Sequence, residues 1–360
     1  MIKGSISYVI PMFNAEKHIK RCIDSILSSD KNANIIIVDD GSTDNADDVL
    51  AEYIAQSNIR IFKKENGGPA LARNYGLQFV LTEFVSFIDA DDYLLPNYDP
   101  NKLIMQLKNT DWLIFGYESK YSLGKKVNSN FTKLNHTQVL DIRTFLEQIY
   151  VWMNPKNNFF NAPWNKIYKM SIIKKHKLQF DKSYKYTEDL YFNICYLRHV
   201  NTVTIIPDVL YGYCLENTMS ESRSGDASWW HNLNKAHHYL EQLIVEKSDK
   251  QLASLKEYRM FHENIAIQYL NLLLFSTPRD RIKEVIKKKP ACLPIRNPQN
   301  KHILYTLSAC AIKALPLSLS SESIYSLSKI VKRKVKLSKG DPSKAGSADV
   351  TSSKGVSSYC

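Results

Sequence analysis

The chain has 360 residues, 44% of them hydrophobic, which is enough to build one large core or two moderate ones. Its formal net charge of +12 is uneven: residues 1–100 hold nine Lys and Arg against fifteen Asp and Glu, whereas the remainder holds 39 against 21. An acidic first part without a recognition motif argues against nucleic-acid binding, and the basic excess at 279–289 and 329–339 favours an anionic membrane surface as a partner.

Cysteine usage and the N-terminus bear on the compartment. The six cysteines include no C-x-x-C pair and no histidine at metal-ligand spacing, so the sequence predicts neither a zinc site nor a disulfide framework. The first residues lack the pattern of a signal peptide. We therefore expect a cytoplasmic chain, with any membrane association peripheral and on the inner face of the cell membrane.

Apolar runs alternate with helical patterns along the first ninety residues. The strand candidates are residues 6–10, 35–38, 59–62 and 84–88, and amphipathic helix patterns separate them. This alternation predicts an α/β fold with a parallel sheet and right-handed crossovers.

The polar segments that follow these strands are expected to meet. Because the carboxyl ends of parallel strands lie along one edge of a sheet, residues 11–14, 39–44, 66–68 and 89–92 should line one crevice. The chain has neither a G-x-G-x-x-G after its first strand nor a P-loop motif, so dinucleotide and P-loop sites are excluded. Another device must hold any phosphate bound there.

The segment 84–96 is an apolar strand that ends in Asp89, Asp91 and Asp92. These carboxylates repel one another unless a cation or a ligand lies among them. A divalent cation that bridges a diphosphate fits this arrangement, and a solvated acidic turn is the alternative.

Four segments carry a family resemblance. Tyr8–Glu16, Ile37–Asp44, Gly67–Asn74 and Asp89–Asp92 resemble, in this order, the motifs of bacterial family-two glycosyltransferases, over roughly residues 5–215. The resemblance implies the GT-A fold, a Rossmann-like, mostly parallel sheet with helices on both faces. It also implies a nucleotide-sugar donor, usually a UDP-sugar, a divalent cation (Mn²⁺ or Mg²⁺), and inversion at the anomeric carbon.

The same resemblance assigns roles in donor binding. The residues that match the donor-side motifs are Pro11, Phe13, Asn14 and Glu16 around the nucleoside, Asp40 on the base, Gly68 in the following turn, Arg73 facing phosphate or the acidic strand end, and Asp89 on ribose or sugar hydroxyls. Asp39 either contacts the ligand or caps the turn after it. For Arg73 the alternative is a surface ion pair.

Metal and catalytic roles follow from two acidic elements. Asp91 matches the metal ligand, and Asp92 either completes the metal shell or caps the next turn. Asp189 matches the general base that takes the proton of the acceptor hydroxyl, with Glu188 as the second candidate. The alternative is that both acids merely favour the positive end of a helix that begins near Thr187.

The acceptor side is assigned to Trp164 and Lys166. A sugar ring can stack on Trp164, although a buried tryptophan that anchors a loop is the other interpretation. Cys214 stands where the family often has arginine, and Lys166, Arg223 and His231 are candidates for the missing cation.

The expected organisation has three parts. Residues 1–220 form the catalytic domain, with a nucleotide-sugar half (1–100) and an acceptor half (101–220); residues 221–339 form a helical, basic region, and residues 340–360 a disordered tail. The apolar run 303–315 is too short to span a bilayer, but with the basic cluster after it the run can lie on an anionic surface or pack as an ordinary helix.

The expected function is transfer of a sugar from a nucleotide-diphosphate sugar to a glycan or lipid-linked hydroxyl in bacterial surface polysaccharide synthesis. One alternative is a metal-dependent phosphohydrolase, because the 89–91 segment resembles the nucleophile motif of haloacid-dehalogenase-like phosphatases, although it follows the fourth strand rather than the first. The other alternative is a non-enzymatic basic protein that binds membrane or nucleic acid.

Overall fold

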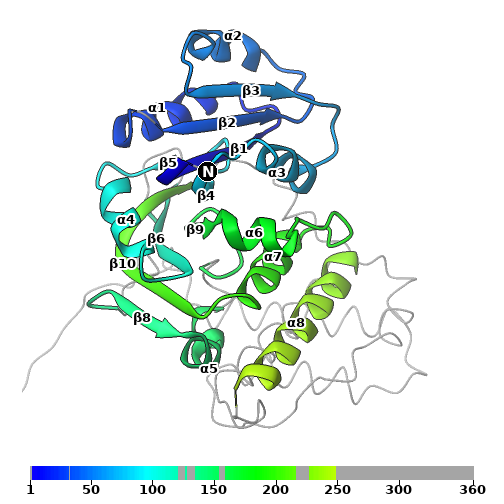
Figure 1. Cartoon of the computed structure of the whole chain (residues 1–360). Helices are drawn as coiled ribbons and strands as arrows, with labels where there is room; N and C mark the ends of the chain where they lie inside the picture. The colour runs from blue at the N-terminus through cyan, green and yellow to red at the C-terminus, as the bar shows by residue number, and fades with distance from the viewer. Residues whose placement is uncertain are drawn as a thin grey trace, which may run out of the picture. The chain divides into compact units, whose positions relative to one another are not determined.

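The computed structural model describes residues 2–31, 33–120, 126–127, 134–153, 159–215 and 227–248. The chain divides into two units, Met1–His262 and Glu263–Cys360, and the second unit lies wholly outside the described residues (Figure 1). The expectations for the basic segments beyond residue 248, for the tail, for Arg223 and for the side chain of His231 therefore also lie outside what is described.

The first unit begins with alternating strands and helices. In chain order these are β1 (Ile2–Met12), α1 (Ile19–Ser29), β2 (Asn34–Asp39), α2 (Ala46–Leu50), a 3-10 turn (Ala51–Tyr53), β3 (Ile59–Lys63), α3 (Pro69–Leu77) and β4 (Thr82–Phe87). This is the order that the hydrophobic pattern predicts. Proline occupies the first position of α3, where its missing N–H costs no helical hydrogen bond.

The second half is less regular. Its elements are β5 (Tyr93–Leu94), α4 (Pro100–Leu107), β6 (Trp112–Lys120), β7 (Lys126–Val127), β8 (Gln138–Asp141), α5 (Ile142–Trp152), β9 (Lys166–Lys169), α6 (Met170–His176), α7 (Glu188–Leu197), β10 (Thr202–Cys214) and α8 (Ala227–Lys247).

The described strands form one mixed sheet in the order β3-β2-β1-β4-β9-β6-β10-β5, with β7 beside β6 and β8 beside β10. β1 pairs in parallel with β2 and β4, and β2 with β3, so the predicted parallel half is confirmed. At the end of β1, Pro11 lies opposite Val38, which brings the loops after these two strands together. β9 then joins the sheet antiparallel to both β4 and β6.

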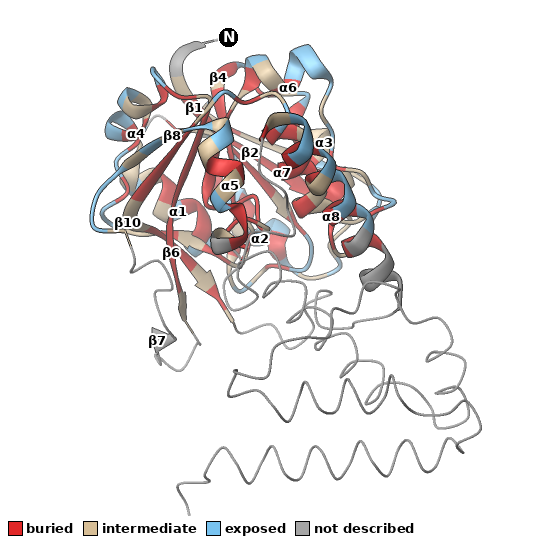
Figure 2. Ribbon diagram, turned by 90° about the horizontal axis from the view of Figure 1, so that it is seen from below, coloured by how far each residue is buried: buried red, intermediate tan, exposed pale blue. Residues whose placement is uncertain are grey.

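The core lies on both faces of the sheet. Burial is concentrated on the strands and on the inner sides of the helices that flank them (Figure 2). In β2 the run from Ile35 to Val38 is fully buried, as expected for a strand covered on both sides. Helix α3 approaches the sheet at Gly76, where a Cβ would come within 2.6 Å of Val9, so only glycine permits this packing.

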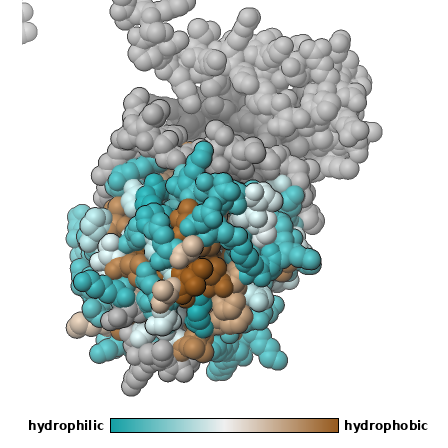
Figure 3. Space-filling view, turned by 90° about the horizontal axis from the view of Figure 1, so that it is seen from above, coloured by the Kyte–Doolittle hydropathy of each residue, from teal (hydrophilic) through white to brown (hydrophobic). Residues whose placement is uncertain are grey.

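The side of the unit that carries α2 and the edge strand β3 is largely polar. Seen from this side, hydrophilic residues surround a small group of hydrophobic ones (Figure 3). Single exposed apolar side chains such as Ile54 are normal on a protein surface.

Helix α8 belongs to the first unit. Arg198 at the end of α7 forms an ion pair with Glu246 at 2.6 Å, and Asn232 donates to the carbonyl of Lys185 at 3.2 Å. The unit therefore extends past residue 220, where the sequence analysis placed the end of the catalytic domain. Within the described ranges, no helix is long and apolar enough to cross a bilayer.

Candidate active site

Hydrogen bonds connect the loops after β1 and β2 at one end of the crevice. Asn14, with a positive φ of 50°, accepts the backbone N–H of Thr43 at 2.8 Å. The backbone N–H and the carboxylate of Glu16 both bond to residues 44–45, at 2.8 and 3.3 Å. The side chains of Asn14 and Glu16 thus shape the loops, and Phe13 beside them keeps 51% of its surface exposed.

Asp40, the residue expected on the base, lies buried at the end of β2 and already has protein partners. Its carboxylate accepts the N–H of Gly67 at 3.1 Å and that of Gly68 at 2.7 Å, and it forms an ion pair with Lys64. Asp39 accepts the N–H of Ser42 at 2.9 Å, so its carboxylate caps the turn that follows β2, one of the two roles considered for it. Asp40 therefore fixes the 64–68 loop, and any base N–H must share its carboxylate with these donors.

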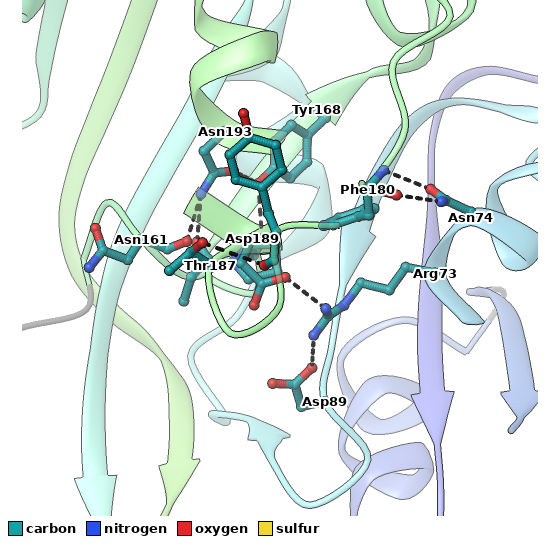
Figure 4. Close-up of polar contacts among 12 residues, drawn as sticks. Arg73, Asn74, Asp89, Asn161, Tyr168, Phe180, Thr187, Asp189 and Asn193 are labelled. Atoms are coloured by element: carbon teal, nitrogen blue, oxygen red, sulfur yellow. Dashed lines mark hydrogen bonds and ion pairs between the residues drawn. The ribbon is translucent and has the colours of Figure 1, made fainter. Parts of the chain in front are cut away.

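Arg73 joins the two acidic elements of the sequence. From the first turns of α3, its guanidinium donates from Nη2 to Asp89 at 2.8 Å and from Nη1 to Asp189 at 2.7 Å (Figure 4). Asp89 follows β4, whereas Asp189 lies in the first turn of α7. Phe180 supports the guanidinium, whose carbon is 5.3 Å from the ring centre. One arginine thus brings two carboxylates 100 residues apart in sequence to the same point.

Charge and burial compete at this bridge. The Arg73 side chain is only 4% exposed, and burial opposes its charge, but Asp189 and Asp89 outweigh that effect and raise the pKa of Arg73. Burial raises the pKa of Asp189 to about 8, against the opposing attraction of Arg73 and with further repulsion from Glu188 and Asp89. Both acids of the bridge keep 28% of their side chains exposed, so a ligand can reach them.

The two remaining acids of the β4 turn differ in their surroundings. Asp92 is fully buried, and its carboxylate accepts the Tyr211 hydroxyl at 2.6 Å and the N–H of Cys214 at 2.8 Å, both from β10. Burial, with repulsion from Asp91 and Asp89, raises the pKa of Asp92. The sequence predicts Asp92 as a metal ligand or as a cap of the next turn. Its two carboxylate oxygens instead accept hydrogen bonds that connect the β4 turn to β10. Asp91 is partly exposed.

Trp164 and Lys166 are buried, contrary to their assignment to the acceptor side. Trp164 is 3% exposed and stacks on Tyr211 at 4.5 Å between ring centres, so the anchoring alternative describes it. The ammonium of Lys166 has no exposure and donates to the carbonyls of Phe159 at 2.7 Å and Ala162 at 2.5 Å. Burial lowers the pKa of Lys166 well below its usual value. Lys166 therefore cannot supply a cation to the crevice.

The helix that carries Asp189 is fixed by a buried polar network that the sequence analysis did not identify. Asn193, one turn after Asp189, donates from its amide to the carbonyls of Phe160 at 2.7 Å and Asn161 at 3.0 Å. The Tyr168 hydroxyl donates to its amide oxygen at 2.6 Å (Figure 4). These contacts attach α7 to the loop before β9, and no local motif in the sequence signals them.

The acidic residues of the β4 turn are the candidate metal ligands of the crevice. Over the described residues, no group of three His, Cys, Asp or Glu side chains is arranged to hold an ion. Asp89 and Asp91 at the β4 turn carry carboxylate oxygens, a type of ligand that Mg²⁺ prefers.

A mixed sheet of this topology, with an acidic turn after β4, is the arrangement expected of the GT-A fold. Residues 7–177, a little under half of the chain, match the sequence model of the family described as Glycosyl transferase family 2.

Relatives in sequence and structure agree with this assignment. The chain is 28% identical over 223 residues to the putative glycosyltransferase EpsH of Bacillus subtilis (58% of this chain, 60% of EpsH). It is 26% identical over 307 residues to the minor teichoic acid biosynthesis protein GgaA of the same organism (79% of this chain, 63% of GgaA). The chain thus spans less than two thirds of the length of each.

Among solved structures, residues 1–349 of TarS from S. aureus share the fold. The TM-score is 0.59 at 17% identity, over 93% of this chain and 92% of that one. The same TarS fragment has been crystallised in complex with UDP and with UDP-GlcNAc, with TM-scores of 0.57 and 0.54 to this chain.

Proposed function

We propose that the chain is an inverting glycosyltransferase that moves a sugar from a nucleotide-diphosphate sugar, a UDP-sugar in the first instance, to a hydroxyl of a glycan or lipid-linked acceptor. The observation that carries the proposal is the Arg73 bridge, because it brings the D-x-D acid Asp89 and the candidate base Asp189 to one point. The UDP and UDP-GlcNAc complexes of TarS support the donor class. GgaA supports a role in bacterial surface polymer synthesis.

In this proposal the reaction is a single displacement. Asp189 accepts the proton of the acceptor hydroxyl, whose oxygen attacks the anomeric carbon from the face opposite the diphosphate. The bond from that carbon to the phosphate oxygen breaks as the new glycosidic bond forms, and the bonding electrons leave with the nucleoside diphosphate. The products are the inverted glycoside, the nucleoside diphosphate and a proton on Asp189.

Asp91 is the residue that we assign to holding a divalent cation, Mn²⁺ or Mg²⁺. When bound there, such an ion supplies positive charge for the developing negative charge of the leaving group. Asp89, which accepts a hydrogen bond from Arg73, is assigned to sugar or ribose hydroxyls of the donor. Phe13, half exposed next to the 43–45 loop, is assigned to the nucleoside.

The test is a screen of nucleotide sugars with Mn²⁺ or Mg²⁺ for release of nucleoside diphosphate, with and without sugar acceptors. Two matched variants, Asp189→Asn and Glu188→Gln, change neighbouring acids in the first turn of α7. Loss of a general base costs about 10²- to 10⁴-fold in turnover, so we expect this loss in D189N only, with donor binding retained. Near-normal turnover of D189N would assign the base elsewhere, and release of inorganic phosphate in place of a nucleoside diphosphate would identify a phosphohydrolase.

A further inference from the structure

A second arginine reaches the acidic turn from α1. The Arg21 guanidinium donates from Nη2 to the backbone carbonyl of Asp91 at 2.7 Å and to the Cys214 sulfur at 2.9 Å. Arg21 lies on an exposed part of the helix, outside every motif of the sequence. Its side chain nevertheless reaches the residue to which we assign the cation.

The guanidinium of Arg21 packs against the aromatic ring of Tyr93. Its carbon lies 4.8 Å from the centre of the Tyr93 ring. That ring in turn lies flat against β10 at Gly212, where a Cβ would come within 2.4 Å of it. Only glycine at 212 leaves room for Tyr93, and Tyr93 with the Asp91 carbonyl and Cys214 then orients Arg21. A long side chain at the surface is thus held in one place before any ligand arrives.

The hydrogen bonds of Arg21 do not involve an acidic side chain of the described residues. Both of its hydrogen bonds leave from Nη2 and end on uncharged atoms, and none of its contacts with described residues is an ion pair. Three other cations near the crevice, among the described residues, form ion pairs: Arg73 with Asp89 and Asp189, Lys64 with Asp40, and Lys120, which also lies over the Tyr93 ring, with Glu118. An exposed and oriented guanidinium next to an acidic turn suits a phosphate group, which it can bind through two parallel N–H donors.

We propose that Arg21 binds the β-phosphate of the nucleoside diphosphate and stabilises the charge that this group gains as it leaves. The inference rests on the proposed function and deepens it, because it names the cation of the leaving-group subsite. The assignment also fits the cysteine at position 214, where the family often has arginine. Because the Arg21 guanidinium contacts the Cys214 sulfur, α1 supplies the cation at this point instead of β10.

The test measures binding of UDP, UMP and uridine by calorimetry in the presence of Mg²⁺. Losing a charge-assisted contact to the β-phosphate should weaken UDP binding about ten- to hundredfold in Arg21→Ala, and should leave UMP and uridine binding unchanged. Arg21→Lys should lose part of this affinity, since an ammonium keeps the charge without the planar pair of donors. The turnover number of Arg21→Ala should fall with the affinity for UDP.

The matched control is Lys20→Ala, which removes the neighbouring cation on α1. Lys20 forms ion pairs with Glu52 and Asp24 at the surface, so its loss should leave UDP binding as it is. A second variant, Arg21→Ala with Cys214→Arg, returns a guanidinium to the same place and should recover part of the UDP affinity. Urea unfolding of each variant checks that the fold is intact.

The outcomes separate this inference from the proposed function. If the wild-type chain binds UDP and R21A binds it equally well, or loses UDP and UMP affinity to the same extent, the role of Arg21 is refuted and the proposed function stands. A change confined to the KM of the acceptor also refutes it. If the wild-type chain binds no nucleoside diphosphate at all, the proposed function fails, and the assignment of Arg21 fails with it.

Discussion

Replacing Arg73 with methionine tests the link between the two acidic elements directly. Methionine keeps most of the aliphatic length but removes the guanidinium, so Asp89 and Asp189 lose their shared partner while little space is left empty. The change should lower the stability of the fold and the acidity of Asp189 at the same time. These two effects can be measured independently.

The loss of stability follows from the two hydrogen bonds, at 2.8 and 2.7 Å. Hydrogen bonds to charged groups contribute about 1.5–3 kcal/mol each, and breaking a fully buried ion pair costs about 3–5 kcal/mol. Because Asp89 and Asp189 each keep 28% of their side chains exposed, water compensates part of the loss. We expect Arg73→Met to lower the free energy of unfolding by about 2–4 kcal/mol, measured by urea titration.

The effect on acidity appears in the pH dependence of turnover. Asp189 must be deprotonated to accept a proton, so turnover should rise with pH around its pKa of about 8. The charge of Arg73 holds this pKa down, so its removal moves the midpoint to higher pH. At a fixed pH below the midpoint, raising the pKa of Asp189 by one leaves about tenfold less of the deprotonated base.

Arg60→Met is the matched control. Arg60 in β3 donates to the carbonyl of Phe79 at 2.8 Å and contacts no acid of the site. Its replacement should cost about 0.5–1.5 kcal/mol and leave the midpoint of the pH profile unchanged. The reasoning is refuted if R73M keeps the wild-type midpoint, or if it destabilises the chain less than R60M does.

Two further substitutions test buried and exposed groups of the site. Lys166→Met removes an ammonium that donates to the carbonyls of Phe159 and Ala162 and to the side-chain oxygen of Asn165. Both carbonyls keep an amide partner, from Asn165 and Asn193 respectively, but the buried Asn165 oxygen loses this donor, so we expect a loss of about 1–3 kcal/mol in urea unfolding and an unchanged KM for the acceptor. If the variant instead raised the KM for the acceptor without any loss of stability, Lys166 would be assigned to acceptor binding. Asp91→Asn should abolish the stimulation of turnover by Mn²⁺ or Mg²⁺ and lower the rate about a hundredfold or more; wild-type turnover that survives EDTA would remove the metal from the mechanism.

The sequence predicts the parts of the site that lie at the ends of parallel strands. The period of the hydrophobic runs fixes β1 to β4, and parallel pairing then forces their C-terminal loops to one edge. The contacts of Asn14 with Thr43 and of Asp40 with Gly68 are direct consequences. Arg73 reaches Asp89 for the same reason, since α3 begins at the edge of the sheet where β4 ends.

The contacts that the sequence does not reveal depend on long-range pairing. Lys166 begins β9, a strand of four residues that enters the sheet antiparallel between β4 and β6, and a run this short carries no clear period. Asp92 is buried by Tyr211 and Cys214, about 120 residues later in the chain. Arg21 looks like any solvent-facing residue of an amphipathic helix. The contacts of Asp92 and Arg21 follow from the packing of β10 against the acidic turn, and those of Lys166 from the loop before β9.

The charge of the crevice explains why each cation in it matters. The site lies on the acidic part of a basic chain, since residues 1–100 carry a balance of −6. Arg73 balances two acids already, and Asp92 is engaged by uncharged donors. A diphosphate that enters next to Asp91 therefore meets repulsion unless Arg21 and a divalent cation both act there. Removing either one should leave that repulsion unbalanced. We therefore expect Arg21→Ala to weaken UDP binding most at low Mg²⁺ concentration and less at high Mg²⁺ concentration.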